Sequence, residues 1–395
     1  MKGKKKILFL IHTLQVGGAE KVLVNLVNNM DTNKYDITVM TVINAGAFRK
    51  KLNKNIHYKT IFDIKFLSKE NKTNNKKNSG NLFSRTSKIK NILAVIYKFF
   101  WRHANCKKIY NKYVKDDYDI EIAFLEGVSS KIIANSTNEK SKKICWLHVD
   151  LINETKTEKF FKNNEDEANN YKKFDKIVGV SKFVINQAIK KYELDPNKTI
   201  VKYNPIDKKD IEEKAKDKLN IKKDNFTMIS IGRLSKQKGY DRLLNIVRKL
   251  NEDNPKFDLW IIGVGAEEEK LKKYISEYHL TNVKLLGYQS NPYKYINIAD
   301  MFVCSSRAEG FSTVVSEAVI LGKPIVTTDC SGMREILGEN SEYGLICENN
   351  EESLYNALKV MLTDKKKYEY YKNIVKKRKE IFDIETAVNN IEELF

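Results

Sequence analysis

The chain has 395 residues, 42% of them apolar and 31% charged, and its formal net charge is +20. These values predict a folded protein of two domains, each large enough to bury its own core. No stretch approaches the ~20 apolar residues of a membrane span, and the five scattered cysteines exclude a zinc ribbon and favour buried thiols over a disulfide framework.

Residues 7–11 are expected to form a first buried strand, because this apolar run is too short for a signal peptide. Gly17 and Gly18 follow, and a helix is expected over 19–28. Such a βα turn lies at the carboxyl edge of a parallel strand, where open α/β sheets bind ligands. Glycine lets the backbone approach a ligand closely, although an ordinary glycine-rich turn is the alternative.

Strands are expected over 35–42 and 57–61, and a strongly basic stretch comes next. Residues 64–115 contain 14 Lys or Arg and one acid. Residues 64–87 lack periodicity and are predicted to form a surface loop, whereas 88–114 are predicted to form one amphipathic helix. The apolar and aromatic stripe of this helix suits either an anionic membrane surface or the protein core.

Three further strands are expected over 118–125, 143–147 and 175–180. His148 follows the second of these directly, so it would face the same sheet edge as the first glycine turn. A site residue and a structural histidine are the two interpretations of this position.

The βα alternation repeats after a polar stretch at 208–223, which together with Pro205 predicts a domain boundary. A strand over 226–231 leads into a loop that contains Arg233 and Lys238. Both side chains can reach one anion across a strand-to-helix turn, Arg as a fork and Lys as a point charge. Two unrelated surface bases are the alternative.

Two more strands follow in this half. Gly263 and Gly265 come after an expected strand over 257–262, and their turn predicts a further close approach of backbone to a ligand at the carboxyl edge of the second sheet. Tyr288 follows an expected strand over 283–287.

The next buried strand leads to a turn at Gly310 and a helix that Ser312 or the residue after it would cap. Free amide groups at this helix start favour a phosphate. Glu309 and Glu317 would accept hydrogen bonds from sugar hydroxyls. The combination indicates a nucleotide-sugar site, and ordinary surface acids are the alternative.

Taken in order, these motifs resemble glycosyltransferase family 4, the retaining GT-B enzymes among the group 1 glycosyltransferases of surface polysaccharide synthesis. The resemblance covers nearly the whole chain and is strongest over 230–349. The motifs that carry it are Gly17-Gly18-Ala19-Glu20, Gly232-Arg233-Leu234 with Lys238-Gly239, Gly263-x-Gly265, Glu309-Gly310-Phe311 with Glu317, and Gly322-Lys323-Pro324.

The resemblance implies an α/β GT-B fold, in which two Rossmann-like domains face each other across a cleft. The acceptor-binding domain would span 1–205, the nucleotide-sugar-binding domain 206–378, and a C-terminal helix over 379–395 would cross back to the first domain. No metal and no cofactor would be needed. Catalysis would depend on His148, Arg233, Lys238 and Glu309, and the donor would contact Gly17, Gly18, Gly263, Gly265, Tyr288, Gly310, Phe311, Ser312 and Glu317.

The expected reaction is the retaining transfer of a hexose or N-acetylhexosamine from a UDP-sugar to a lipid-linked or growing surface glycan, of the capsule, exopolysaccharide, O-antigen or teichoic-acid type. A synthase with a soluble acceptor is the alternative within this class. A nucleic-acid-binding protein would explain the positive charge but lacks a reader motif, and a Rossmann oxidoreductase would need G-x-G-x-x-G. We expect a cytoplasmic protein, either free or bound at the inner face of the membrane through residues 88–115.

Overall fold

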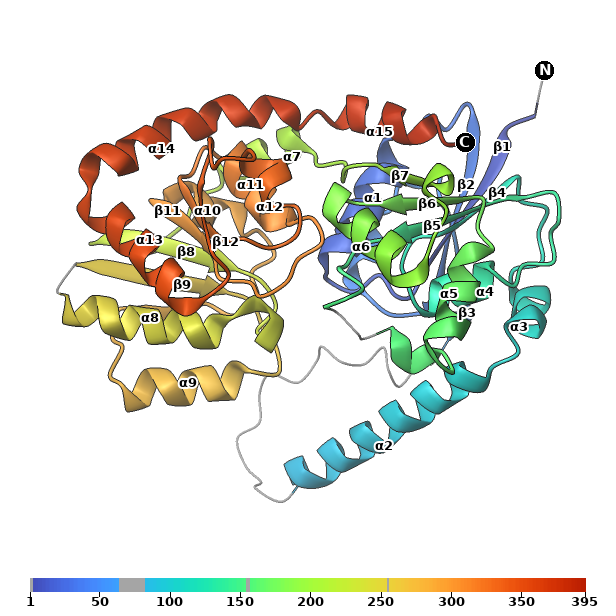
Figure 1. The fold of residues 1–395 in the computed structure, drawn as a ribbon, viewed down its shortest axis with the longest axis horizontal. Helices are drawn as coiled ribbons and strands as arrows, with labels where there is room; N and C mark the ends of the chain where they lie inside the picture. Colours follow the sequence, from blue (N-terminus) through green and yellow to red (C-terminus); the bar gives the residue numbers. More distant parts are fainter. Residues whose placement is uncertain (1–2, 64–81, 154–156, 254–255) are drawn as a thin grey trace. The chain divides into compact units, whose positions relative to one another are not determined.

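A computed structural model describes residues 3–63, 82–153, 157–253 and 256–395, with side chains described from residue 92 onward in the helix that begins the second range. The chain divides into two compact units (Figure 1). Unit 1 contains Met1–Tyr203 and Val388–Phe395, and unit 2 contains Asn204–Ala387.

Unit 1 is built on a seven-stranded parallel sheet with the strand order β3-β2-β1-β4-β5-β6-β7. Residues Ile7 to Ile11 of β1 are all buried, as expected for a central strand covered on both faces. The order runs outward in opposite directions from β1 and β4, so the switch point lies between them. The strands are β1 (Lys5–Ile11), β2 (Tyr35–Ile43), β3 (His57–Phe62), β4 (Ile120–Ala123), β5 (Lys142–Leu147), β6 (Lys176–Gly179) and β7 (Thr199–Val201).

The helices of unit 1 alternate with these strands, and the last of them comes from the end of the chain. They are α1 (Gly18–Asn29), α2 (Leu82–His103), α3 (Cys106–Tyr113), α4 (Val128–Ile133), α5 (Asn164–Lys172), α6 (Lys182–Tyr192) and, from Val388 onward, α15 (Ile384–Glu392).

Unit 2 repeats the plan with a six-stranded parallel sheet of order β10-β9-β8-β11-β12-β13, whose switch point lies between β8 and β11. The strands are β8 (Phe226–Ile231), β9 (Phe257–Ile262), β10 (Val283–Leu285), β11 (Met301–Cys304), β12 (Ile325–Thr328) and β13 (Leu345–Cys347). The helices are α7 (Lys208–Lys214), α8 (Tyr240–Glu252), α9 (Glu268–Glu277), α10 (Tyr293–Ile298), α11 (Thr313–Ile320), α12 (Met333–Leu337), α13 (Glu351–Thr363) and α14 (Lys365–Arg378).

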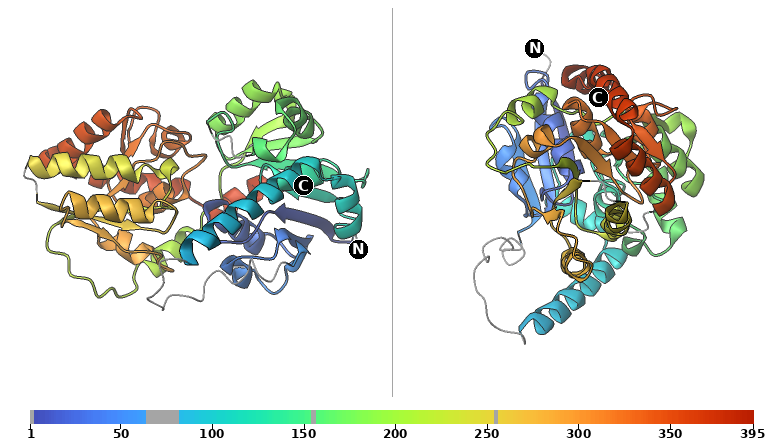
Figure 2. Two further views of the ribbon diagram at one scale, coloured as in Figure 1. Left: turned by 90° about the horizontal axis from the view of Figure 1, so that it is seen from below. Right: turned by 90° about the vertical axis from the view of Figure 1, so that its left-hand side faces the viewer.

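The helices of unit 2 form a layer on each face of its sheet. On one face, α8, α9 and α13 contribute side chains such as Leu243, Leu271 and Leu354 to one buried apolar cluster. On the other, α11 packs against α7 and α14 (Figures 1 and 2). This layering follows from the parallel strands, because each crossover helix must cover a face of the sheet.

The end of the chain forms part of the core of unit 1. The ring of Phe395 packs edge-on against Phe9 and Tyr35, with centroids 6.3 and 5.8 Å away. The ammonium group of Lys142 donates to the Leu394 carbonyl at 2.6 Å. The last eight residues are therefore fixed by both apolar and polar contacts to the first sheet.

The predicted single helix over 88–114 is wrong, because the structure has two helices there. α2 begins at Leu82, inside the predicted loop, and ends at His103. The side chain of Asn105 then accepts a hydrogen bond from the Lys108 amide at 3.0 Å and starts α3. Asparagine is among the strongest helix N-caps, so this break is encoded locally. The rest of the predicted loop, 64–81, lies outside the described residues.

Candidate functional site

Loops that follow different strands of unit 2 lie backbone against backbone. A Cβ atom on Gly263, after β9, would lie 1.9 Å from the carbonyl oxygen of Gly232, after β8. A Cβ atom on Gly239 would lie 2.1 Å from the carbonyl oxygen of Ser305, after β11. No side chain fits at these distances, so glycine is what allows the three loops to meet at the switch point.

The functional groups at this point are a cation and a carboxylate in direct contact. The Lys238 ammonium lies 2.5 Å from Oε1 of Glu309, and the Ser306 hydroxyl donates to the same oxygen at 2.6 Å. Burial lowers the pKa of Lys238, but the negative charge of Glu309 outweighs this and holds the pKa above its usual value. The lysine is therefore a fixed positive charge throughout the neutral range.

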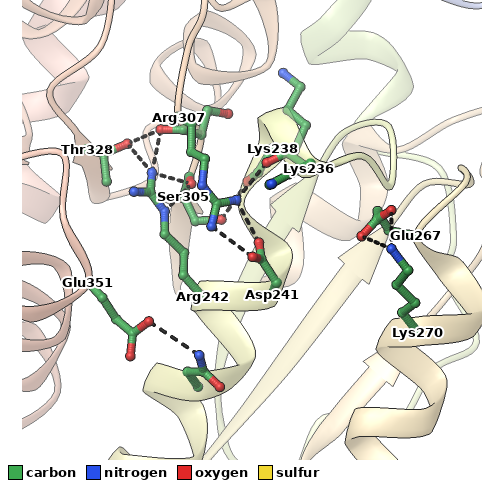
Figure 3. A network of polar contacts seen from close by, with 12 residues as sticks. Lys236, Lys238, Asp241, Arg242, Glu267, Lys270, Ser305, Arg307, Thr328 and Glu351 are labelled. Carbon is green, nitrogen blue, oxygen red and sulfur yellow. Dashed lines mark hydrogen bonds and ion pairs between the residues drawn. The ribbon is translucent and has the colours of Figure 1, made fainter.

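Two arginines fasten α8 to the loop that carries Glu309 (Figure 3). The buried guanidinium of Arg242 donates to the carbonyl oxygens of Ser305 at 2.6 and 2.8 Å and of Ser306 at 2.6 Å. Closer to solvent, Arg307 forms a bidentate ion pair with Asp241 at 2.7 and 2.8 Å. Sequence reasoning missed Arg242, whose only local signal was its place in the helix after the Arg233–Lys238 loop.

Two of the predicted site residues are exposed. Arg233 follows Gly232 directly, and its side chain makes no hydrogen bond or ion pair with other described residues. Tyr288 is 53% exposed and follows Gly287, whose carbonyl oxygen accepts from the Gly263 amide at 2.9 Å. Both therefore remain available to a ligand at the carboxyl edge of the second sheet.

Helix α11 begins at this edge with a buried, polar first turn. Ser312 is its N-cap residue, but contrary to the prediction its hydroxyl caps no amide and has no hydrogen-bond partner among the described residues. Phe311 is buried beside it, and a Cβ atom on Gly332 would lie 2.7 Å from the Gly310 carbonyl oxygen. Further along the helix, Glu317 is buried and accepts a long, 3.5 Å hydrogen bond from Tyr293.

In unit 1, the prediction that His148 directly follows a strand is confirmed, since β5 ends at Leu147. Its ring packs against Phe124, with the centroids 5.0 Å apart, and Nε2 is buried without a partner among the described residues. Burial lowers the pKa of His148 to about 3, although a hydrogen bond to the Phe124 backbone opposes this shift. The imidazole is therefore neutral at physiological pH.

Sequence reasoning missed Glu126, a carboxylate in the loop after β4. Its Oε2 accepts from the His148 amide at 3.0 Å, and burial raises its pKa to about 7 despite that hydrogen bond. The available signal was an acid three residues past a strand that neighbours β1 at the switch point. A carboxyl group that titrates near neutrality is typical of functional sites.

The glycine turn after β1 leads into α1, which begins at Gly18 without a side-chain cap. A Cβ atom on Gly17 would lie 2.2 Å from a carboxylate oxygen of Glu20. The predicted site residues thus form two sets. Unit 1 contributes His148 and the glycine turn, which follow β5 and β1, and unit 2 contributes the remaining residues.

No group of three or more His, Cys, Asp or Glu among the described residues is arranged to hold a metal ion. The described cysteines are all free thiols.

Comparison with known proteins shows which families and folds the chain resembles. Residues 211–378 match the family model of glycosyl transferases group 1. A Campylobacter jejuni protein, N-acetylgalactosamine-N,N'-diacetylbacillosaminyl-diphospho-undecaprenol 4-alpha-N-acetylgalactosaminyltransferase, is 36% identical over 245 residues. That match covers 59% of this chain and 66% of the relative, just under two thirds of its length.

Solved structures resemble the whole chain. An Anabaena HepE protein, crystallised with UDP and glucose, superposes with a TM-score of 0.71 at 19% identity and covers 99% of both chains. A sucrose-phosphate synthase from Thermosynechococcus elongatus gives 0.71 at 15% identity, over 99% of this chain and 98% of that one. These likenesses confirm the predicted α/β fold. The chain therefore has the GT-B fold of two Rossmann-like domains, and residues 211–378 carry the sequence of the glycosyl transferases group 1 family.

Proposed function

We propose that this protein is a retaining, metal-independent glycosyltransferase that moves a hexose or N-acetylhexosamine from a UDP-sugar to a lipid-linked glycan. The observation that carries the proposal is the contact between Lys238 and Glu309 at the switch point of unit 2. It joins a fixed cation to a carboxylate four residues before α11 begins, so groups suited to phosphate and to sugar hydroxyls are adjacent.

The choice of donor and acceptor is supported by the relatives. The Anabaena protein was crystallised with UDP and glucose, which supports a UDP-sugar donor. The Campylobacter relative is named for an undecaprenol diphosphate-linked acceptor. A lipid-linked acceptor would place the reaction at the cytoplasmic face of a membrane.

The proposed chemistry follows from the charges. Breaking the anomeric C–O bond leaves a nucleoside diphosphate, whose growing negative charge Arg233, Lys238 and the amides at the start of α11 would stabilise. Glu309, held by Ser306, would accept hydrogen bonds from the donor sugar. The departing phosphate would take the proton of the acceptor hydroxyl on the same face, which retains the anomeric configuration.

In unit 1, His148 and the glycine turn offer further groups for the substrates. The neutral imidazole of His148 has an unused Nε2, which suits a hydrogen bond with a sugar hydroxyl. Gly17 and Gly18 would line the site near the phosphate or acceptor groups, beside the Glu20 carboxylate. In unit 2, Glu317 of α11 would accept hydrogen bonds from the ribose hydroxyls.

The direct test is release of UDP from a panel of UDP-sugars in the presence of a polyprenyl diphosphate-linked acceptor, with and without EDTA. We expect turnover that survives EDTA, a product of unchanged anomeric configuration by NMR, and a loss of about 10²–10³ in turnover for Arg233→Ala or Lys238→Ala. Lys270→Ala is the matched control, because the exposed Lys270 side chain pairs with Glu267 at the start of α9 (Figure 3).

No turnover with any nucleotide sugar, or full activity of both variants, would count against the proposal. Turnover only when a free sugar or a sugar phosphate serves as the acceptor would favour the alternative, a synthase with a soluble acceptor.

A further inference from the structure

Helix α2 presents an apolar surface to solvent. Phe99 is 65% exposed and Val95 is 63% exposed, values unusual for side chains of this size. At ~100° per residue, the exposed apolar positions fill a continuous arc of roughly 160° around the helix axis. We call this surface the α2 face, and its members are Ile92, Leu93, Val95, Ile96, Phe99 and Phe100.

The opposite side of α2 is fixed to unit 1. The Tyr97 hydroxyl is hydrogen-bonded to Nε2 of His12 at 2.6 Å, and Trp101 is fully buried. The buried ammonium of Lys131 donates to the carbonyl oxygens of Trp101 at 2.8 Å and Phe160 at 2.9 Å, and so satisfies the C-terminal end of the helix. These contacts set the rotation of α2 about its axis, and that rotation turns the α2 face outward.

The surroundings of the α2 face are positively charged. Residues 92–115 contain no Asp or Glu. All the Lys and Arg of this stretch are exposed, and two of them lie at one edge of the apolar arc. They are Lys98, Arg102, Lys107, Lys108, Lys112 and Lys115.

We propose that the α2 face docks on an anionic lipid bilayer, with its apolar side chains at the boundary between headgroups and acyl chains. The cations beside it would lie at the level of the lipid phosphates. Charge complementarity favours this partner over a second copy of the chain, because two such helices would bring their cations together. No described helix is long and apolar enough to cross a membrane, so the contact would be interfacial.

This docking would bring the protein to its acceptor, and that part of the inference rests on the lipid-linked acceptor of the proposed function. His12 directly follows β1, and the glycine turn at Gly17 and Gly18 comes from the same strand. The Tyr97–His12 hydrogen bond therefore ties the membrane-facing helix to the sheet edge where the acceptor is expected. A lipid-linked acceptor would reach this edge without leaving the bilayer surface.

Flotation of the full-length protein with lipid vesicles, in the absence of any donor, tests the inference. We expect binding to vesicles with equal parts of phosphatidylglycerol and phosphatidylcholine, little binding to pure phosphatidylcholine, and weaker binding at high salt. Val95→Asp with Phe99→Asp should lower the affinity at least about tenfold, because charges on the apolar side resist entry into the bilayer. Lys98→Glu with Arg102→Glu should lower it similarly.

The matched control is Val360→Asp with Tyr370→Asp, which changes a valine and an aromatic residue at exposed positions of unit 2 and should bind as the parent does. UDP affinity, measured without vesicles, should be unchanged in all three variants, and this result would show that they are folded. Parent-like vesicle binding by both α2 variants would overturn the proposal. Failure of the parent protein to bind anionic vesicles would also overturn it. The same holds if the parent forms a dimer that the Val95→Asp, Phe99→Asp double variant does not form. If the parent protein does not bind UDP, that result would instead contradict the proposed function.

Discussion

The ammonium of Lys238 and the carboxylate of Glu309 lie 2.5 Å apart, although 71 residues separate them in the sequence. The contact forms because β8 and β11 are neighbours in the second sheet, so the loops after them meet. We expected one residue to hold the donor phosphates and the other the donor sugar. Their contact means that a ligand at this point would meet a pair that is already assembled.

The stability of this pair can be separated from its role in turnover. Lys238→Ala leaves the nearly buried Glu309 carboxylate without its cation, so we expect a loss of about 2–3 kcal/mol in the free energy of unfolding. Adding Glu309→Ala to that variant should recover part of the loss, since the second change removes the unpaired charge. Urea unfolding of the two single variants and the double variant measures the coupling, and purely additive effects would contradict a direct interaction.

Arg242 is predicted to be a positioning residue. Arg242→Ala would remove the guanidinium donor from the Ser305 carbonyl oxygen and leave the Ser306 carbonyl oxygen with the Thr328 hydroxyl as donor. We expect the free energy of unfolding to fall by about 3 kcal/mol or more. Arg242→Lys keeps the charge but loses the fork, so the KM for the donor should rise more than kcat falls. Both can be measured by thermal melting and steady-state kinetics.

The control for this prediction is Arg307→Ala. Its bidentate pair with Asp241 is half-exposed, so the free energy of unfolding should fall by no more than about 1 kcal/mol. A smaller loss for Arg242→Ala than for Arg307→Ala would contradict the assigned role.

Gly263 is predicted to tolerate no side chain. Its φ is +150°, and a Cβ atom would lie 1.9 Å from the Gly232 carbonyl oxygen, so Gly263→Ala must separate the loops after β8 and β9. We expect a loss of at least ~2 kcal/mol together with weaker UDP binding. Gly287→Ala is the control, because its φ of +65° adds strain of about 1–2 kcal/mol but no atom of the described residues lies within 4 Å of the new atom. If Gly263→Ala and Gly287→Ala weaken UDP binding equally, the close approach of Gly263 to Gly232 does not contribute to UDP binding.

The raised pKa of Glu126 predicts a dependence of stability on pH. Because the folded carboxyl titrates at about 7, above its ordinary value, the folded state retains a proton that the unfolded chain has lost. This contribution is fully present below about pH 4.5 and is lost as the pH rises through 7. Glu126→Gln should therefore stabilise the protein at pH 8, by roughly 1–3 kcal/mol, and have little effect at pH 4.5.

Thermal melts of Glu126→Gln at the two pH values test this sign, with the exposed Glu139→Gln as the control. A stabilisation that is the same at pH 4.5 and pH 8 would mean that the charge of Glu126 is not its cause.

The parts of the fold that local sequence determines were predictable. Buried strands showed as short apolar runs, and glycines marked the turns after them, so the position of His148 directly after β5 followed from the sequence. The break between α2 and α3 was also encoded, since Asn105 is a strong N-cap, but the apolar periodicity on both sides concealed it.

The contacts that assemble the site could not be read in this way. Arg242 and Ser305 are 63 residues apart, and no local sequence pattern predicts that α8 contacts the loop after β11. Glu126 was overlooked for a related reason, because the His148 amide that it binds is 22 residues away and follows a different strand. Such long-range pairings depend on strand order, which periodicity does not reveal.

The measurement that tests the central claim most directly is calorimetric titration with UDP and with uridine. If Arg233 and Lys238 neutralise the donor diphosphate, Arg233→Ala and Lys238→Ala should each weaken UDP binding by about tenfold or more and leave uridine binding unchanged. Equal affinity of the parent and both variants for UDP, or an equal loss for UDP and uridine, would contradict the account.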